Sequence, residues 1–380
     1  MPDPFLYERV YSHVLEEIRT ESIKPGERVP SEKELAEQFG VSRITSKRAL
    51  RMLAEAGVVD RRRGQGSFVT VDVQRLEAIR RSGDRKGELK RRSGCLALVL
   101  PDASEAYGLG LLCAIEERAA ELGYHLVVRR TRDSQEVEEQ AVGSLVGDGA
   151  ADGLIVFPVH GEFYNASLLR LVLDRFPLVL VDRYLRGIRA SAVFTDNVAA
   201  ARALTSHVLD EGHDQVVFLS PPVENTTSIE ERIVGFQEEL RERGYPPEAQ
   251  HCLTEFRSTL PKARTADGSG MAEADMKTLQ AFLRTEPGVT GFVACEYDIA
   301  VLVRKVLGDV TGKRSPGRRT IACFDSPAQP SATGRFVYIK QDQQEMGRRA
   351  VDLLVAQLAG AEVPLKSVVP FTLVDPTTQA

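Results

Sequence analysis

Two hydrophobic patterns divide the chain near residue 70. Before that point, apolar residues recur every three or four positions in short stretches, which is the period of amphipathic helices. After residue 94, short continuous apolar runs alternate with longer stretches of helical period. Continuous apolar strands between amphipathic helices are typical of a parallel β-sheet with both faces covered. The pattern therefore predicts a small helical domain followed by a large α/β domain.

The strand and helix alternation in the large domain runs twice. Expected strands are residues 95–101, 124–130, 153–158, 178–182, 215–220, near 251, 291–295 and 320–325, with helices at 109–122, 136–145, 168–173, 198–209, 229–243, 275–283 and 299–307. The alternation restarts after residues 194–197, so we expect two sheets and two lobes. Ligands of such folds bind at the carboxyl ends of the strands, which makes the cleft between the lobes the expected site. Residues 261–271 contain one proline and two glycines and are expected to be a mobile surface insertion without assigned chemistry.

Residues 30–69 carry the start and stop signals of two short helices. Ser31 is followed three residues later by Glu34, a capping box that satisfies free amides at a helix start. The first helix should begin at about Glu32 and end at Gly40, because glycine tolerates the left-handed conformation of a sharp helix exit. Ser42 can cap the second helix. Its buried stripe is expected to be Ala49, Leu50, Leu53 and Ala54, and its cationic face Arg43, Lys47 and Arg51.

A strand, a tight turn and a second strand follow the second helix. The turn is 64–66, a Gly-Gln-Gly tip, and three arginines at 61–63 precede it. Such a wing suits contact with DNA phosphates or the minor groove. A basic helix face alone is usually only a solvated face, but its combination with helix-turn-helix spacing and an arginine-rich wing predicts a winged helix-turn-helix that binds duplex DNA.

Length and charge agree with this division. A chain of 380 residues exceeds one hydrophobic core, so two or three domains are expected. Residues 1–93 hold 20 Lys and Arg against 15 Asp and Glu, whereas residues 94–380 hold 29 against 39. A net positive charge on residues 1–93 suits a domain that binds the phosphates of DNA, whereas residues 94–380 are net negative. Residues 71–93 are charged and lose the apolar period, so we expect a linker between a domain at 1–70 and one at 94–380.

The sequence offers no signal for a membrane, a metal or a cofactor. No apolar run reaches about 18 residues and the N-terminus lacks a signal-peptide pattern, so we expect a cytoplasmic protein without a membrane partner. The five cysteines stand singly in apolar contexts, without metal-ligand spacing, and are expected to be core residues. No phosphate-binding loop or catalytic motif occurs, although Gly108 and Gly110 offer a partial one. The alternative, a doubly wound α/β enzyme acting on a nucleotide or sugar, is therefore the weaker hypothesis.

The stretch PSEKELAEQFGVSRITSKRAL resembles the signature of the GntR family of bacterial transcription regulators, and the similarity extends over about residues 5–69. One position departs from the family pattern, because Ser46 stands where valine is usual, and we expect a weaker core contact or a shifted helix there. The resemblance implies these DNA-contacting residues: Lys33, Ser42, Arg43, Thr45, Lys47, Arg63, Gly64, Gln65 and Gly66.

Residues 94–380 resemble the effector-binding domain of LacI/GalR repressors and their periplasmic sugar-binding relatives, through the pieces GLIVFP, PLVLVDRYLRG, TDN, ERIVGF, CFDSP and VYIKQDQQEMGRRAVDLL. A GntR-type head on this body is similar to the arabinose-responsive repressors. The resemblance implies a two-lobed periplasmic-binding-protein-like fold with three crossovers, lobe one taking residues 94–194 and about 342–362. It implies these effector-binding residues: Arg183, Arg232, Glu296, Asp325 and Gln341. Tyr107, after the first strand, is a further expected effector-binding residue, because its ring offers an aromatic surface on which a sugar can stack.

Several of these assignments have plain alternatives. Arg183 can instead form a salt bridge with Asp182 or Asp196, and Asp325 can cap the following turn. Glu296 and Tyr297 stand where relatives have Asn-Asp, which makes a neutral pentose or hexose a less certain ligand. Arg, Asp and Gln do supply the bidentate donors and acceptors that polyols need.

The expected function is an effector-responsive transcription regulator, with repression as the expected sign and without catalysis or cofactor. A sugar-like ligand in the cleft would close the lobes and change the affinity for DNA. A single winged module reads few base pairs, so we expect a homodimer on a palindromic operator.

Overall fold

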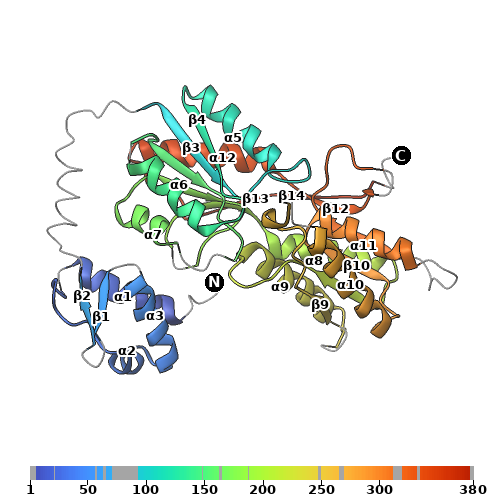
Figure 1. Ribbon diagram of the computed structural model, residues 1–380, viewed down its shortest axis with the longest axis horizontal. Helices are drawn as coiled ribbons and strands as arrows, with labels where there is room; N and C mark the ends of the chain where they lie inside the picture. Colours follow the sequence, from blue (N-terminus) through green and yellow to red (C-terminus); the bar gives the residue numbers. More distant parts are fainter. Residues whose placement is uncertain are drawn as a thin grey trace. The chain divides into compact units, whose positions relative to one another are not determined.

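A computed structural model provides the structure of the chain (Figure 1). It describes residues 6–20, 22–55, 58–62, 66–70, 93–147, 149–161, 165–186, 188–246, 250–264, 269–310, 319–331 and 334–376. The expected linker up to residue 92 and the wing tip at Arg63, Gly64 and Gln65 lie outside the described residues. None of the described helices is both long and apolar enough to cross a lipid bilayer.

The head is a three-helix unit followed by a two-stranded wing. Its elements are α1 (Leu6–Arg19), α2 (Glu32–Phe39), α3 (Arg43–Glu55), β1 (Val59–Arg62) and β2 (Gly66–Val69). The capping box at Ser31 is confirmed, since Ser31 Oγ accepts from Glu34 N and the Glu34 carboxylate accepts from Ser31 N. The expected exit is confirmed at Gly40, whose φ of 63° is left-handed. The two strands pair antiparallel, with Asp60 opposite Phe68, as the wing requires.

Ser46, which stands where valine is usual, has a hydrogen-bonded side chain in the head. Its side chain is fully buried, and Ser46 Oγ donates to the carbonyl oxygen of Glu32 at 2.6 Å and lies 3.2 Å from that of Arg43. The hydroxyl therefore joins α3 to the first residue of α2. The apolar contact that valine would make is absent, and the hydrogen bond from the buried Ser46 hydroxyl compensates for its loss.

The first lobe of the body is a six-stranded parallel sheet in the order β13-β7-β6-β5-β3-β4. Its strands are β3 (Cys95–Leu100), β4 (His125–Arg130), β5 (Gly153–Val156), β6 (Leu178–Val181), β7 (Ser191–Thr195) and β13 (Lys366–Val369). Helices α5 (Leu109–Glu121) and α12 (Gln343–Leu358) pack on one another and on this sheet around Leu98, Ile155 and Val351. The chain also forms α6 (Gln135–Gly147) and α7 (Ala166–Leu173).

The second lobe holds a sheet in the order β14-β12-β11-β10-β8-β9, parallel except for the edge strand β14. Its strands are β8 (Val216–Leu219), β9 (Gln250–Leu253), β10 (Gly291–Ala294), β11 (Thr320–Phe324), β12 (Val337–Gln341) and β14 (Phe371–Val374). Alternate residues of these strands belong to two separate cores. One core contains residues of α8 (Asn197–Asp210) and α9 (Thr227–Glu242), and the other residues of α10 (Ser269–Thr285) and α11 (Tyr297–Val310).

Three chain crossings join the lobes, as expected, and two details of the prediction are wrong. The crossings lie between β7 and α8, between β12 and α12, and between β13 and β14. Residues 366–369 were expected in lobe two, but β13 pairs with β7 and extends the first sheet. The expected insertion at 261–271 is partly helical, with a 3-10 helix at Pro261–Arg264 and the start of α10 at Ser269. Ala263 in this segment is buried, so it is not a purely surface feature.

Candidate functional site

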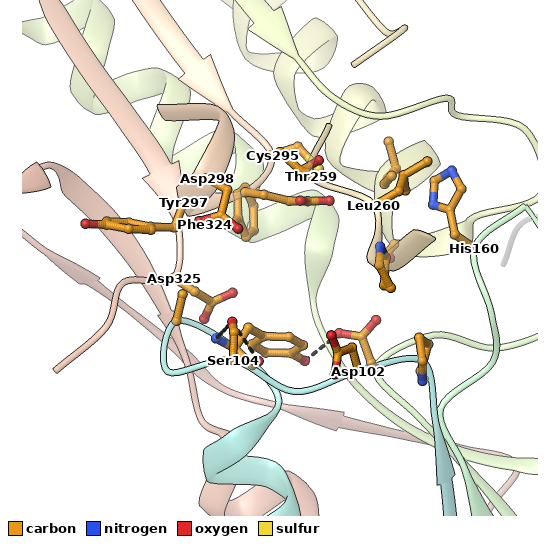
Figure 2. A pocket seen from close by; sticks show the side chains of 18 of the residues that line it. Asp102, Ser104, His160, Thr259, Leu260, Cys295, Tyr297, Asp298, Phe324 and Asp325 are labelled. Carbon is orange, nitrogen blue, oxygen red and sulfur yellow. Dashed lines mark hydrogen bonds between the residues drawn. The ribbon is translucent and has the colours of Figure 1, made fainter. Parts of the chain in front are cut away.

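A cavity of about 160 Å³ lies between the two lobes of the body, at the carboxyl ends of the strands. Figure 2 shows Asp102 and Ser104 of the first lobe on one side, facing Thr259 and Asp298 of the second lobe on the other. Both lobes therefore build the cavity, in the place where open α/β sheets bind ligands, outside the carboxyl ends of their strands. All six residues nominated from the sequence line it: Tyr107, Arg183, Arg232, Glu296, Asp325 and Gln341.

The first lobe contributes a linked group around Asp182, the buried residue that follows β6. Its carboxylate accepts from the Tyr107 hydroxyl and from Arg183 Nε, the latter at 3.2 Å. The alternative salt bridge for Arg183 is thus present, and the guanidinium still lines the cavity, lying 4.8 Å from the Phe157 ring centroid. Arg183 Nη1 is buried and has no hydrogen-bond partner among the described residues. It is a donor available to a ligand oxygen.

Tyr107 lies differently from the stacking platform that was expected. Its ring meets Phe157 edge to face at 6.2 Å between centroids, and its hydroxyl binds Asp182. Burial, followed by the nearby carboxylates of Asp182 and Asp325, holds the pKa of Tyr107 well above its ordinary value. The phenol therefore remains a neutral donor that fixes the orientation of Asp182.

The second lobe contributes Arg232, which is 6% exposed and projects from α9. Arg232 Nε donates to Asn197 Oδ1 at 2.9 Å and Nη1 donates to the carbonyl oxygen of Cys295 at 2.8 Å. The guanidinium carbon lies 3.8 Å from the centroid of the Phe324 ring. These contacts fix the Arg232 guanidinium at the cavity wall. Binding a ligand therefore costs little further side-chain entropy at this residue.

Asp325 follows β11 and lies opposite Gln341 at the second chain crossing. Gln341 Nε2 donates to Asp325 Oδ2 at 2.6 Å, so the side chain binds the crossing strand as well as facing the cavity. Burial raises the pKa of Asp325 to about 7, although the nearby Arg232 and the hydrogen bond from Gln341 oppose the shift. A carboxyl of this kind can change its charge near neutral pH.

Glu296 and Asp298 stand at the start of α11, in a part of the cavity wall that also includes Thr259. Burial, followed by repulsion from Asp298, raises the pKa of Glu296. The helix N-terminus offsets part of this cost, because its free amides favour negative charge. Glu296 and Tyr297 stand here in place of the Asn-Asp pair expected from the resemblance to the LacI/GalR family.

Several further cavity residues were missed from the sequence, and most share one recognisable position. Asp102, Asp133, His160 and Asp182 each follow the carboxyl end of one of four first-lobe strands. The strand-end rule applied to every strand would have found them. Asp133, Asp182 and Asp325 also have positive φ values of 62°, 69° and 60°. Backbone strain at non-glycine residues is concentrated at functional sites, so this clustering is a second signal visible only in the structure.

The N-terminal turn of α9 forms direct contacts between the lobes. Tyr184 Oη donates to Glu231 Oε1 at 2.8 Å, and Thr227 Oγ1 donates to the Tyr184 carbonyl oxygen at 2.9 Å. Gly161 N donates to Thr226 Oγ1 at 3.0 Å, and Arg186 pairs with Glu230 at 2.6 Å. These interlobe contacts, made by residues 226–231, depend on the distance between the lobes.

In the head, the nominated residues with described side chains gather on two adjacent helices and the wing. Arg43 and Lys47 are exposed on α3, opposite its buried Ala49, Leu50 and Leu53. Ser42 Oγ accepts from Thr45 N at 3.1 Å, which confirms its capping position. Lys33 is 64% exposed on α2, and Gly66 begins β2 with φ of 113°. This φ is one that residues with a Cβ rarely adopt, which favours glycine at position 66.

Comparison with known proteins finds a family model for each domain. Residues 6–69 match the model for bacterial regulatory proteins of the gntR family, and residues 205–376 match the periplasmic binding protein-like domain. The chain is 28% identical over 355 residues to the arabinose metabolism transcriptional repressor of Halalkalibacterium halodurans, covering 93% of this chain and 88% of that repressor. It is 28% identical over 344 residues to the regulator PtxS of Pseudomonas plecoglossicida, covering 88% and 90%.

A solved structure supports the same fold. The transcriptional regulator CelR in complex with cellobiose superposes with a TM-score of 0.63 at 22% identity, covering 91% of this chain and 99% of that one. The relatives are named as regulators, which confirms the prediction of a regulator and is against the alternative of an enzyme. The chain is therefore a transcription regulator that joins a GntR-family winged helix-turn-helix head to a periplasmic-binding-protein-like effector domain of the LacI type.

Proposed function

We propose that this regulator is a repressor whose affinity for a palindromic operator is controlled by a sugar or sugar derivative bound in the interlobe cavity. The observation that carries the proposal is the convergence of the six nominated residues on one cavity of a chain that also bears a DNA-binding head. The names of the relatives refer to arabinose and, for CelR, to cellobiose, which supports a sugar-like effector class.

The cavity wall suits a polyol because it presents fixed donors and acceptors from both lobes. Arg183 Nη1 is an unused buried donor, while Asp182 and Asp325 are acceptors whose positions are fixed by Tyr107 and Gln341. Hydroxyl groups both donate and accept, so one polyol satisfies donors and acceptors on opposite walls together. Leaving such buried groups without a partner is costly, which gives the site its specificity.

Gating follows from differential binding to two arrangements of the lobes. A ligand that touches both walls stabilises the arrangement in which the walls are close, and the equilibrium moves only by that difference in affinity. The interlobe contacts of residues 226–231 favour the same arrangement. We infer that a pair of bodies in a homodimer transmits this change to two heads that read two half-sites.

DNA recognition is tested by removing one cation from α3. An operator is first obtained by selection from random duplex DNA, and binding is then measured by fluorescence anisotropy at fixed salt. Lys47→Ala or Arg43→Ala is expected to weaken binding by about 1–3 kcal/mol while effector affinity stays intact. The control is Lys277→Ala, which removes an exposed charge from α10 of the body. Equal losses of operator affinity in Lys47→Ala and Lys277→Ala would argue against direct contact between α3 and the operator.

The gating step is tested with sugars that demonstrably bind. A thermal-shift screen identifies ligands, because a compound that binds the folded cavity raises the melting temperature. Operator affinity is then measured with and without each ligand. The proposal fails if no ligand that binds the full chain changes its affinity for the selected operator.

A further inference from the structure

The connection from β9 to α10 borders the cavity and is unusually long. It runs over residues 254–268, whereas a strand and a helix of an α/β unit are usually joined by roughly 2–6 residues. Connections of this length are uncommon in compact domains and usually serve binding or flexibility. Thr259, Leu260 and Pro261 of this connection line the cavity. This position points to binding.

Residues 256–261 are fixed to the second lobe at two points. Phe256 is 2% exposed and belongs to the core that contains residues of α10 and α11. The next two backbone amides, Arg257 N and Ser258 N, donate to Asp275 Oδ2 at 3.0 and 2.8 Å. Asp275 lies on α10 and is itself buried. Moving the segment outward would remove both donors from a buried carboxylate, so the lobe holds this part of the wall in place.

Leu260 follows this anchor and reaches the cavity as a half-buried apolar side chain. Figure 2 shows Leu260 of the second lobe and His160 of the first lobe at the same end of the cavity. Next to His160, Gly161 N donates to Thr226 Oγ1 of the second lobe at 3.0 Å. This end of the cavity is therefore narrowed by contact between the lobes and lined by a side chain that offers no hydrogen bond to a sugar hydroxyl.

The volume of the cavity suits a small ligand. It is about 160 Å³, whereas pockets for drug-sized molecules measure roughly 300–1,000 Å³. A disaccharide belongs to that larger size class, and one sugar ring with its hydroxyls is about half as large. The interlobe contacts of residues 226–231 are present at the same time, so this is the volume of the cavity with the lobes in contact.

We propose that residues 256–261 restrict the effector to a compound with one sugar ring, and that Leu260 is the residue that excludes a second ring. This inference rests on the proposed function, because it assigns the size of the ligand of the same cavity. A hydroxyl buried against Leu260 would lose its hydrogen bonds to water and gain none, so a longer sugar is disfavoured by this cost as well as by lack of space. Asp275 is a positioning residue, because it acts through the amides of Arg257 and Ser258.

The test compares monosaccharides with disaccharides built from them. Arabinose and arabinobiose, xylose and xylobiose, and glucose and cellobiose are titrated calorimetrically into the full chain at pH 7. For at least one pair, we expect the monosaccharide to bind and the disaccharide to bind at least about 100-fold more weakly. In Leu260→Ala, the ratio of the two dissociation constants should fall by about tenfold or more, because space opens beside the ring. Leu260→Val, with a smaller truncation, should lower the ratio less.

Variants of Asp275 separate positioning of the segment from general stability. Asp275→Ala should lower the ratio in the same direction as Leu260→Ala, because the segment loses its anchor. Asp275→Asn keeps an oxygen that can accept from the two amides, so its ratio should stay within about threefold of wild type. Leu373→Ala, which truncates an exposed leucine of β14 outside the cavity wall, is the matched control and should leave the ratio unchanged. Circular dichroism melting identifies any variant that fails to fold.

Three results would overturn the size limit: no monosaccharide of these pairs binds, a disaccharide binds wild type as tightly as its monosaccharide, or the folded Leu260 variants keep the wild-type ratio. The outcomes also separate this proposal from the proposed function. A disaccharide that binds best and changes operator affinity would reject the size limit and leave the gated repressor intact. A monosaccharide that binds with the expected selectivity without changing operator affinity would support the size limit and reject gating.

Discussion

Asp325→Asn isolates the energetic cost of the buried Asp325 charge at the cavity wall. Asn keeps the shape of the side chain and an oxygen that can accept from Gln341 Nε2, which lies 2.6 Å from Asp325 Oδ2. Asn also tolerates the left-handed backbone at this position, where φ is 60°. The substitution therefore removes the titration of Asp325 and preserves most of its packing.

The magnitude follows from the raised pKa of the folded state. Burial raises the pKa of Asp325 to about 7, against about 3.9 in an unfolded chain. Stability from the protonated carboxyl is complete below the unfolded pKa and is lost as pH rises through the folded pKa. A difference of about 3 pKa units between the folded and unfolded states corresponds to about 4 kcal/mol of unfolding free energy. About 2.5 kcal/mol of this is lost as the pH rises from 5 to 8.

The assay compares unfolding free energies of wild type and variant across this pH range. The chain has no tryptophan, so urea unfolding is followed by far-ultraviolet circular dichroism. The stability of Asp325→Asn relative to wild type should rise by about 2.5 kcal/mol from pH 5 to pH 8, because all other titrations are shared. Asp214→Asn, an exposed position on the same lobe, is the control. A relative stability of Asp325→Asn that stays constant with pH would refute the reasoning about buried charge in this cavity.

Three further substitutions test single contacts. Ser46→Ala should lower the unfolding free energy of the chain by about 1 kcal/mol in urea titrations, because the hydrogen bond from Ser46 Oγ to the Glu32 carbonyl oxygen is lost. Gly235→Ala should cost about 1–3 kcal/mol in the same assay, since a Cβ would lie 2.2 Å from the Val198 carbonyl oxygen and force α8 from α9. Tyr184→Phe should raise the effector dissociation constant about tenfold by calorimetry, because an interlobe hydrogen bond to Glu231 is lost. An unfolding free energy that stays at the wild-type value in Ser46→Ala or Gly235→Ala, or an unchanged effector dissociation constant in Tyr184→Phe, would contradict the role assigned to that contact.

The head was predictable because its signals are local. A capping box at Ser31, a glycine exit at Gly40 and a cap at Ser42 each act within four residues, so sequence spacing alone places them. The hydrogen bond from Ser46 to Glu32 spans 14 residues and depends on how α2 meets α3. Family comparison identified Ser46 as unusual, but only the three-dimensional arrangement showed what its hydroxyl does.

The body was predictable in its central strands and less so at its edges. Strands such as β5 and β10 are buried along their whole length and read as continuous apolar runs. Strand β13 has exposed residues at Lys366 and Val368, lies at the sheet edge and follows α12. Its partner strand could not be inferred from its own pattern, since edge strands carry a weak apolar signal.

The cavity shows the limit of residue-by-residue inference. The six residues nominated from the sequence all line it, and so do Asp102, Asp133 and Asp298, which no motif singled out. Both nominated arginines line the cavity, but their hydrogen bonds to Asp182, Asn197 and the Cys295 carbonyl oxygen could be found only from the coordinates. The full set of side chains on the cavity wall is therefore a property of the assembled lobes.

Helix α9 connects the two parts of the proposed mechanism. Its first turns carry Thr227 and Glu231, which contact the first lobe at Tyr184, and Arg232 follows at the cavity wall. Because one rigid helix bears both groups, a ligand that fixes Arg232 against the first lobe also fixes the distance at which the Tyr184 contacts can form. Close packing of α9 on α8, which Gly235 permits, carries any movement of α9 into the core of the second lobe. A change in effector occupancy is therefore expected to move the lobes as units rather than loosen a single loop.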